Sequence, residues 1–199
     1  MQQQLTIINE AGAYVFVLPG WMDPGSSATL FESLRREAPW SRPIFTNRFG
    51  KSNPTPREMA FFADPDVAEK TEYVPWECAA ELPSVKYLHQ LETDMERVAR
   101  QPFNSCAINH YRDGSDYIAA HSDNEVSRSS PAVAALSLGG TRLFRFTSKT
   151  DPTKKIEFPV NSGDLMVMAG ATQKLWRHEV PKQSGAGARI SVTYRFLDV

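Results

Sequence analysis

Apolar and polar residues alternate with two different periods along this chain. Between residues 84 and 100 the apolar residues recur at spacings of three, four and seven, which predicts an amphipathic helix with one packing face. They are Val85, Leu88, Leu91, Met95, Val98 and Ala99. A second helix is predicted over 26–38, with serines at its start and Pro39 as a stop. The first hundred residues are therefore expected to mix two helices with short strands.

After residue 102 the period changes to two, which is typical of half-buried strands. Strands are predicted at 103–111, 117–121, 132–138, 141–147, 156–160, 165–169, 176–180 and 188–197. Turn sequences such as Asp113-Gly114 and Gly139-Gly140 separate several of them. The pattern predicts a mainly β, α+β protein with a sandwich or jelly-roll core, supported on one edge or face by the preceding helices.

The composition narrows the class of protein but does not change the predicted fold. A chain of 199 residues suffices for one domain, and 14 prolines with 11 glycines favour short elements over a helical bundle. Two cysteines are too few for a disulfide framework, which suggests a reducing environment. The start lacks a secretory signal, and the longest apolar run, 13–19, is too short to cross a bilayer. We therefore expect an intracellular protein without a membrane partner, cytoplasmic or, if the source is eukaryotic, nuclear.

The charges are distributed unevenly. A net charge of −1 gives no general affinity for polyanions. One segment, 35–57, is nevertheless basic and carries interleaved aromatic residues. Its residues of interest are Arg35, Arg36, Arg42, Arg48, Lys51 and Arg57, with Trp40, Phe45 and Phe49, against the single acid Glu37. This segment is either a solvated loop region or a surface that contacts phosphates and stacks bases.

A candidate metal site lies in the β-rich half. His121 and Asp123 are two residues apart, so on one strand they would point to the same side. For the third ligand, His89 falls on the polar side of a helix and His110 alternates away from Asn109, which leaves His178. Two histidines and a carboxylate on one face of an octahedral ion suit non-haem Fe(II) oxygenases. The short motif alone is weak evidence for such a site, because a hydrogen-bonded histidine near a turn gives the same pattern.

The last predicted strand gives this motif a context. Arg189, Ser191, Thr193 and Arg195 share one face, and apolar residues share the other. An arginine face could simply be open to solvent. Alternatively, two inward-leaning guanidinium groups could hold a small dicarboxylate, with Asn109 and Tyr111 adding an amide and a phenol. A dicarboxylate beside Fe(II) indicates 2-oxoglutarate.

These segments together resemble the AlkB family of Fe(II)- and 2-oxoglutarate-dependent dioxygenases, and they cover most of 103–197. The matching segments are NHYRDGSDYIAAHSDNE, ALSLGGTRLFRF, SGDLMVMAGATQKLWRHEVP and RISVTYRF, with looser matches at FVLPGWMD and TPRE. The detail is most similar to the branch that repairs alkylated bases in single-stranded DNA and RNA. The resemblance implies a single domain over 1–199. Residues 1–102 would form a nucleotide-recognition lid with supporting helices, and 103–199 a double-stranded β-helix, or jelly-roll, catalytic core.

The resemblance also implies roles for individual residues. Iron would lie on His121, Asp123 and His178. 2-Oxoglutarate would be held by Asn109, Tyr111, Arg189, Thr193 and Arg195, with Arg189 on the distal carboxylate and Arg195 near the end that chelates iron. The residues facing the substrate would be Glu125, Arg142, Arg57 and Tyr73. Tyr73 would stack on the base, and Phe61, Phe62 and Trp76 are the alternative candidates for that role.

The implied activity is oxidative demethylation of bases such as 1-methyladenine and 3-methylcytosine in DNA or RNA. It consumes O2 and releases formaldehyde, succinate and CO2. The partner would be a single strand or a duplex with a flipped base, bound by a monomer. An oxygenase of the same fold that acts on a protein or small molecule is the alternative, which the acidic stretch PDVAEKTEYVPWE favours slightly. A non-enzymatic binding module is a third reading, against which the complete ligand set argues.

Overall fold

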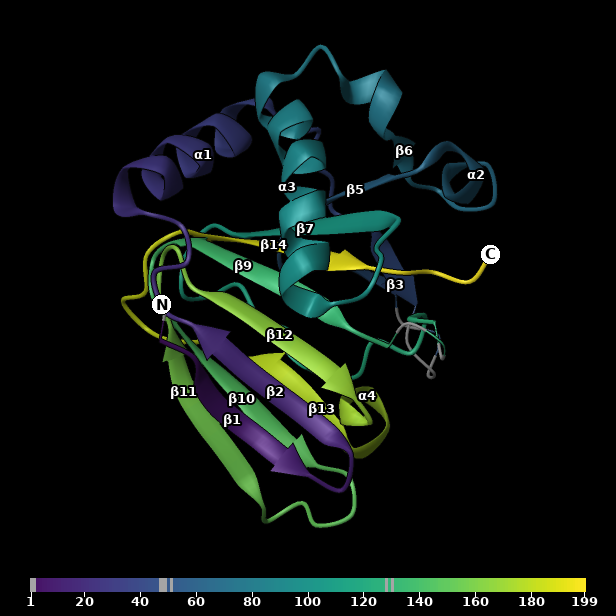
Figure 1. Ribbon diagram of the computed structural model, residues 1–199. Helices are drawn as coiled ribbons and strands as arrows, with labels where there is room; N and C mark the ends of the chain where they lie inside the picture. The colour runs from purple at the N-terminus through teal and green to yellow at the C-terminus, as the bar shows by residue number, and fades with distance from the viewer. Residues whose placement is uncertain (1–2, 47–49, 51, 128, 130) are drawn as a thin grey trace.

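Two β-sheets form the centre of the protein, and helices cover one of them (Figure 1). The computed structural model describes residues 3–46, 50, 52–127, 129 and 131–199. The larger sheet has the order β1-β2-β12-β9-β14-β7-β5-β6, and the smaller one has the order β11-β10-β13-β8. The predicted mainly β fold with a jelly-roll core is confirmed.

The strands of the larger sheet are β1 (Leu5–Glu10), β2 (Ala13–Leu18), β5 (Glu58–Ala63), β6 (Val74–Pro75), β7 (Ser105–Tyr111), β9 (Val133–Gly139), β12 (Leu165–Gly170) and β14 (Arg189–Arg195). Those of the smaller sheet are β8 (Ile118–His121), β10 (Arg142–Ser148), β11 (Lys155–Val160) and β13 (Trp176–Val180). The helical segments are α1 (Pro24–Glu37), α2 (Pro65–Ala68), α3 (Pro83–Ala99), α4 (Thr172–Leu175) and the 3-10 helix η1 (Trp76–Ala79). Every strand predicted after residue 102 is present, with ends that differ by only a few residues.

Four strands from the first part of the chain extend the larger sheet. β2 pairs with β12, and β5 pairs with β7, both antiparallel. Strands from 1–102 and from 103–199 therefore share one hydrogen-bonded sheet. The pattern of apolar residues did not assign these early strands individually, and β2 and β5 pair with strands that lie far away along the chain.

Two apolar cores lie on opposite faces of the larger sheet. One core lies beneath α1 and α3 and includes Ile190, Val192 and Tyr194 of β14. The other lies between the sheets and includes Val133 of β9 and Phe146 of β10. Because neighbouring residues of a strand point to opposite faces, the alternate residues of β14 are directed toward the space between the sheets. The arginine face of this strand is therefore buried rather than open to solvent.

The helix α1 begins earlier than the sequence pattern indicates. Asp23 is its N-cap and accepts a hydrogen bond from Ser26 N at 3.0 Å, and Pro24 occupies the first turn. The helix packs close to the turn after β9. Gly139 has a φ of 83°, and a Cβ there would lie 2.6 Å from the ring of Phe31. Only glycine allows this close approach.

The short hairpin of β3 (Ile44–Thr46) and β4 (Ser52–Pro54) belongs to the basic segment. Arg48, Phe49 and Lys51 lie outside the described residues, so both interpretations of this segment, a solvated loop region and a nucleic-acid surface, stay predictions. Arg35 and Arg36 already pair with the carboxylates of Glu32 and Glu37. Within the part of the chain that the structure describes, no helix has both the length and the apolarity to span a membrane.

Candidate active site and metal centre

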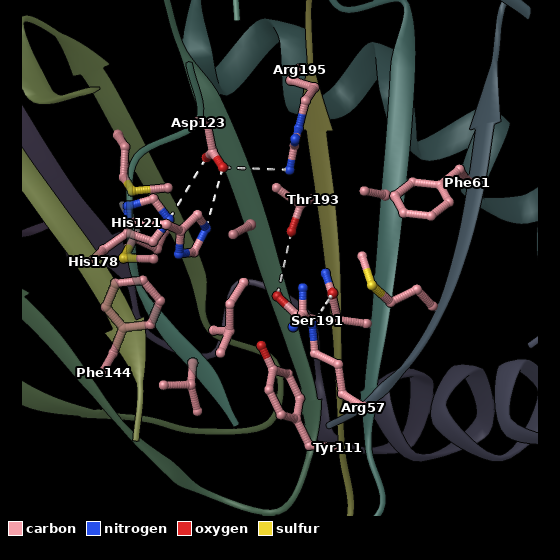
Figure 2. A pocket seen from close by; sticks show the side chains of 18 of the residues that line it. Arg57, Phe61, Tyr111, His121, Asp123, Phe144, His178, Ser191, Thr193 and Arg195 are labelled. Carbon is pink, nitrogen blue, oxygen red and sulfur yellow. Dashed lines mark hydrogen bonds and ion pairs between the residues drawn. The ribbon is translucent and has the colours of Figure 1, made fainter. Parts of the chain in front are cut away.

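A cavity of about 240 Å³ lies between the two sheets. Figure 2 shows His121, Asp123 and His178 gathered on one side of it, and Arg57, Tyr111 and Ser191 on another. All of the predicted site residues except Arg142 line this cavity: His121, Asp123, His178, Asn109, Tyr111, Arg189, Thr193, Arg195, Glu125, Tyr73 and Arg57. The fold thus brings together side chains from both sheets and from the early strands.

The candidate metal ligands converge on one point. His121 and His178 are direct partners across β8 and β13, with ring centroids 4.3 Å apart. Asp123 Oδ1 lies 3.5 Å from His121 Nε2, and Asp123 Oδ2 lies 3.7 Å from His178 Nε2. One ligand atom of each residue lies within 4.8 Å of the others. This spacing allows all three to contact a single cation, and two imidazoles with one carboxylate form the donor set of a facial Fe(II) site.

Asp123 reaches the site by a different route from the one expected. The strand β8 ends at His121, so Asp123 follows it in a loop instead of sharing the strand. The loop is held by Ser122 Oγ, which donates to Trp176 O at 2.8 Å, and by Gln173 Oε1, which accepts from Asp123 N at 3.0 Å. Hydrogen bonds to the segment around α4, rather than strand alternation, therefore bring the carboxylate to the histidines.

The local electrostatics suit cation binding. His121 Nδ1 lies 2.9 Å from Ala119 O, so a proton on Nδ1 leaves Nε2 free as a ligand. Burial lowers the pKa of His178 to about 4, which keeps its ring neutral at pH 7. Burial would raise the pKa of Asp123, but the charge of Arg195 and contacts with His121 and His178 outweigh it and hold that pKa below its usual range. A neutral His178 and an anionic Asp123 are the protonation states in which these residues bind a metal.

The second half of the cavity contains a buried guanidinium group whose donors are only partly satisfied. Arg189 is 1% exposed and donates from Nη2 to Ser137 Oγ at 2.8 Å. Its Nε and Nη1 have no hydrogen-bond partner among the described residues. The guanidinium lies 5.3 Å from the centre of the Tyr111 ring. A buried cation with free donors is costly unless an anion pairs with it, so this position fits a carboxylate ligand.

Arg195 occupies the end of the cavity next to the metal ligands. Its Nη2 lies 3.8 Å from Asp123 Oδ1, and its Nη1 donates to Glu125 Oε1. Burial opposes the charge of Arg195, but Asp123 and Glu125 together hold its pKa above the usual value. Glu125 itself is half exposed at the mouth of the cavity. Arg195 therefore links the candidate metal centre to the cavity entrance.

The outer wall of the cavity is aromatic. Tyr73 packs on Phe61 with ring centroids 4.9 Å apart, and both residues line the cavity.

Arg57 is buried and donates from Nε to Asn109 Oδ1 at 2.6 Å. Burial lowers the pKa of Arg57. Asn109 is thereby oriented by Arg57, which places two predicted site residues in direct contact.

Arg142 is the exception among the predicted site residues. Its side chain is fully buried outside the cavity, contrary to the predicted position near the substrate. Its Nη1 donates to Asp113 O, and its Nη2 donates to Asp116 O and Pro181 O, the last two at 2.8 Å. The guanidinium lies behind the Tyr111 ring at 5.4 Å. These carbonyl groups draw the side chain inward, so Arg142 joins two loops and supports Tyr111.

Several contributing residues were not among the predicted site residues. Ser191 lies between the two arginines on β14 and lines the cavity, as its place on that face indicated. Phe144 stacks on His178 at 5.6 Å and 12°. Gln173 orients the Asp123 backbone. No pattern in the sequence marks Phe144 or Gln173, because their roles depend on contacts between distant elements.

Comparisons with known proteins agree with this geometry. The family model of the 2OG-Fe(II) oxygenase superfamily matches residues 14–195. The chain is 31% identical over 195 residues to the mouse (Mus musculus) alpha-ketoglutarate-dependent dioxygenase alkB homolog 3, covering 91% of this chain and 65% of that protein. It is 30% identical over 202 residues to the DNA oxidative demethylase ALKBH2 of Arabidopsis thaliana, covering 86% of this chain and 62% of that protein. The solved structure of OsALKBH1 has a TM-score of 0.59 and 16% identity, over 96% of this chain and 100% of that one, which shows the shared fold.

The chain belongs to the 2OG-Fe(II) oxygenase superfamily, and its similarity to the two AlkB homologues supports the AlkB family within it. The resemblance predicted from the sequence is confirmed, and with it the cofactors Fe(II), 2-oxoglutarate and O2 that this superfamily uses. The chain spans less than two thirds of the length of either curated relative named above.

Proposed function

We propose that this protein is an Fe(II)- and 2-oxoglutarate-dependent dioxygenase that removes N-alkyl groups from bases in DNA or RNA. The single observation that carries the proposal is the cavity between the sheets. It places a convergent His121, Asp123 and His178 set in the same cavity as the buried, only partly paired guanidinium of Arg189. Two relatives of about 30% identity are named as an alkB-type dioxygenase and a DNA oxidative demethylase, which supports the same reaction class.

In this proposal each group of cavity residues has a separate task. His121, Asp123 and His178 hold the metal. Bound Fe(II), together with 2-oxoglutarate and O2, supplies the oxidising chemistry that hydroxylates an N-methyl group. The products are succinate, CO2, formaldehyde and the unmodified base. The protein's own contribution is to position the reactants and exclude water from them.

The 2-oxoglutarate would be held by residues of β7 and β14. Arg189 offers its free Nε and Nη1 to the distal carboxylate, and the nearby Tyr111 ring shields this ion pair. Asn109, fixed by Arg57, and Thr193 complete the polar wall. Arg195 lies next to Asp123, where it can neutralise the 2-oxoglutarate carboxylate that lies nearest the metal. The two arginines thus hold opposite ends of a short diacid.

The methylated base would enter at the side lined by Glu125, Tyr73 and Phe61. A stacked base cannot reach a cavity between two sheets, so the substrate must be unpaired or flipped. Bases such as 1-methyladenine and 3-methylcytosine are cationic, and Glu125 provides a nearby carboxylate. Tyr73 provides a ring on which the base can stack, supported from behind by Phe61. We further propose that the protein acts as a monomer on single-stranded or flipped-base DNA or RNA.

A substrate panel tests this proposal. Purified protein with Fe(II), 2-oxoglutarate and O2 is incubated with single-stranded DNA and RNA containing 1-methyladenine or 3-methylcytosine, and with methylated peptides. We expect equal amounts of succinate and formaldehyde from the oligonucleotides, and none with Asp123→Ala. If iron and 2-oxoglutarate bind but only peptides or small molecules are oxidised, the nucleic-acid assignment is wrong and the alternative substrate class holds.

A further inference from the structure

A second group of metal-binding side chains lies on the opposite side of the larger sheet from the cavity. Asp64, His89 and Glu92 each offer one ligand atom, and these atoms lie within 4.8 Å of one another. His89 and Glu92 share one face of α3, with His89 Nε2 3.8 Å from Glu92 Oε2. Asp64 comes from the end of β5, which pairs with β7 in the sheet. The group therefore joins a helix to the end of a strand whose Met59 and Phe61 line the active-site cavity.

Glu92 is buried, and its one ion pair within the described residues is the contact with His89, which is charged only when that ring is protonated. The residue is 8% exposed, and its Oε1 has no hydrogen-bond partner within the described part of the chain. The distance of 3.8 Å from Oε2 to His89 Nε2 is too long for a hydrogen bond. Burial, followed by the charges of Asp64 and Glu96, raises the pKa of Glu92 to about 8. An anionic Glu92 lacks the compensation that a buried carboxylate ordinarily requires.

The other two members of the group, Asp64 and His89, are also available as metal ligands. Asp64 occupies the N-cap position of α2, yet its carboxylate makes no capping hydrogen bond. No lysine or arginine within the described ranges forms an ion pair with Asp64 or Glu92. The His89 ring is fixed by stacking on Trp76, with centroids 5.0 Å apart and planes 4° apart, while half of its side chain is exposed. A cation can therefore approach from solvent toward an oriented imidazole.

We propose that Asp64, His89 and Glu92 bind a divalent transition-metal ion at a second site, separate from the active-site cavity. One imidazole and two carboxylates suit Zn²⁺ or another first-row ion better than Ca²⁺ or Mg²⁺, which prefer oxygen ligands alone. The ion joins the end of β5 to α3. Because β5 carries Phe61, and β6 directly follows Tyr73, this link braces the wall of the cavity that would contact the base.

The competing explanation is that Glu92 is a buried, protonated acid that binds no metal. A Zn²⁺ titration of a His121→Ala/Asp123→Ala background, which lacks two of the three active-site ligands, distinguishes these two explanations. We expect one equivalent of Zn²⁺ by calorimetry. Glu92→Gln, which keeps the shape of the side chain, should weaken this binding by about 100-fold or more, because loss of an inner ligand costs at least as much as loss of its supporting contacts. Asp66→Asn, which removes a neighbouring exposed charge, is the matched control and should bind as the background does.

Thermal unfolding provides a second readout. Zn²⁺ at about 100 times its Kd should raise the Tm of the background variant by roughly 5–10 °C, and not that of the Glu92→Gln variant. If Glu92→Gln does not fold, Asp64→Asn and His89→Gln test the same site at less buried positions. The proposal is overturned if the background variant binds no Zn²⁺. It is equally overturned if binding persists unchanged in the ligand variants, because the ion then lies elsewhere.

Discussion

Replacement of Arg189 by methionine should weaken 2-oxoglutarate binding without lowering the stability of the fold. Methionine approximates the length of the arginine stem but removes the guanidinium. Nε and Nη1 of Arg189 have no hydrogen-bond partner within the described residues, and burial lowers the pKa of the group. Removal of a buried, poorly paired charge is often neutral or stabilising. Arg189→Met should therefore keep or slightly raise the free energy of unfolding, although Ser137 loses one hydrogen bond.

The affinity for 2-oxoglutarate should change in the opposite direction. Without Arg189 the distal carboxylate is buried unpaired, which costs about 3–5 kcal/mol. Since about 1.4 kcal/mol corresponds to a factor of ten, the Kd should rise by between about 10² and a few times 10³. Arg189→Lys keeps the charge but loses the two-pronged geometry, so its loss should be smaller, roughly tenfold.

Anaerobic calorimetry with Fe(II)-loaded protein measures this Kd, and urea unfolding of the metal-free protein measures stability. Ser137→Ala is the matched control, because it removes the hydrogen-bond acceptor of Arg189 but keeps the guanidinium. A folded Arg189→Met variant that binds 2-oxoglutarate within threefold of the wild type would refute the assignment of Arg189 to the distal carboxylate.

Three further predictions concern other parts of the site. Gln173→Ala should weaken Fe(II) binding about 10- to 100-fold, because the Asp123 loop loses its support; unchanged metal affinity in a direct titration would contradict this. Glu125→Gln should lower kcat/KM for cationic methylated oligonucleotides about tenfold, since a half-exposed charge contributes only about 1–2 kcal/mol after screening; an equal loss in 2-oxoglutarate affinity would instead indicate an effect through Arg195. Asp116→Asn should lower the free energy of unfolding by about 2 kcal/mol at pH 7. Burial would raise the pKa of Asp116, but hydrogen bonds from Arg112 lower it below the usual value, so this stabilisation should disappear as the pH falls below about 4 in urea unfolding series.

The parts of the site that follow from alternation along a strand were predictable from the sequence. The period of two at 188–197 separated the arginine face from Ile190, Val192 and Tyr194, and the structure buries these two faces in the cavity and in the helix-covered core. The same reasoning directed His110 away from Asn109, and His110 indeed contacts Glu58 outside the cavity at 2.8 Å. Local geometry is sufficient for such predictions because it does not depend on the partner strand.

The parts that depend on contacts between distant segments were not predictable. Asp123 lies in a loop that Gln173 and Trp176 position, so its alignment with His121 does not arise from a shared strand. Arg142 lies in a matching segment, yet carbonyl groups of two distant loops draw it away from the cavity. Strand period and motif spacing contain no information about such partners.

The most direct test of the central claim is a diffraction experiment on anaerobic crystals that contain Mn(II) and 2-oxoglutarate. The account predicts one anomalous peak within bonding distance of His121, Asp123 and His178, with the far carboxylate of the diacid on Arg189. A metal peak bonded to fewer than these three residues, or a diacid carboxylate that leaves Arg189 unpaired, would contradict it.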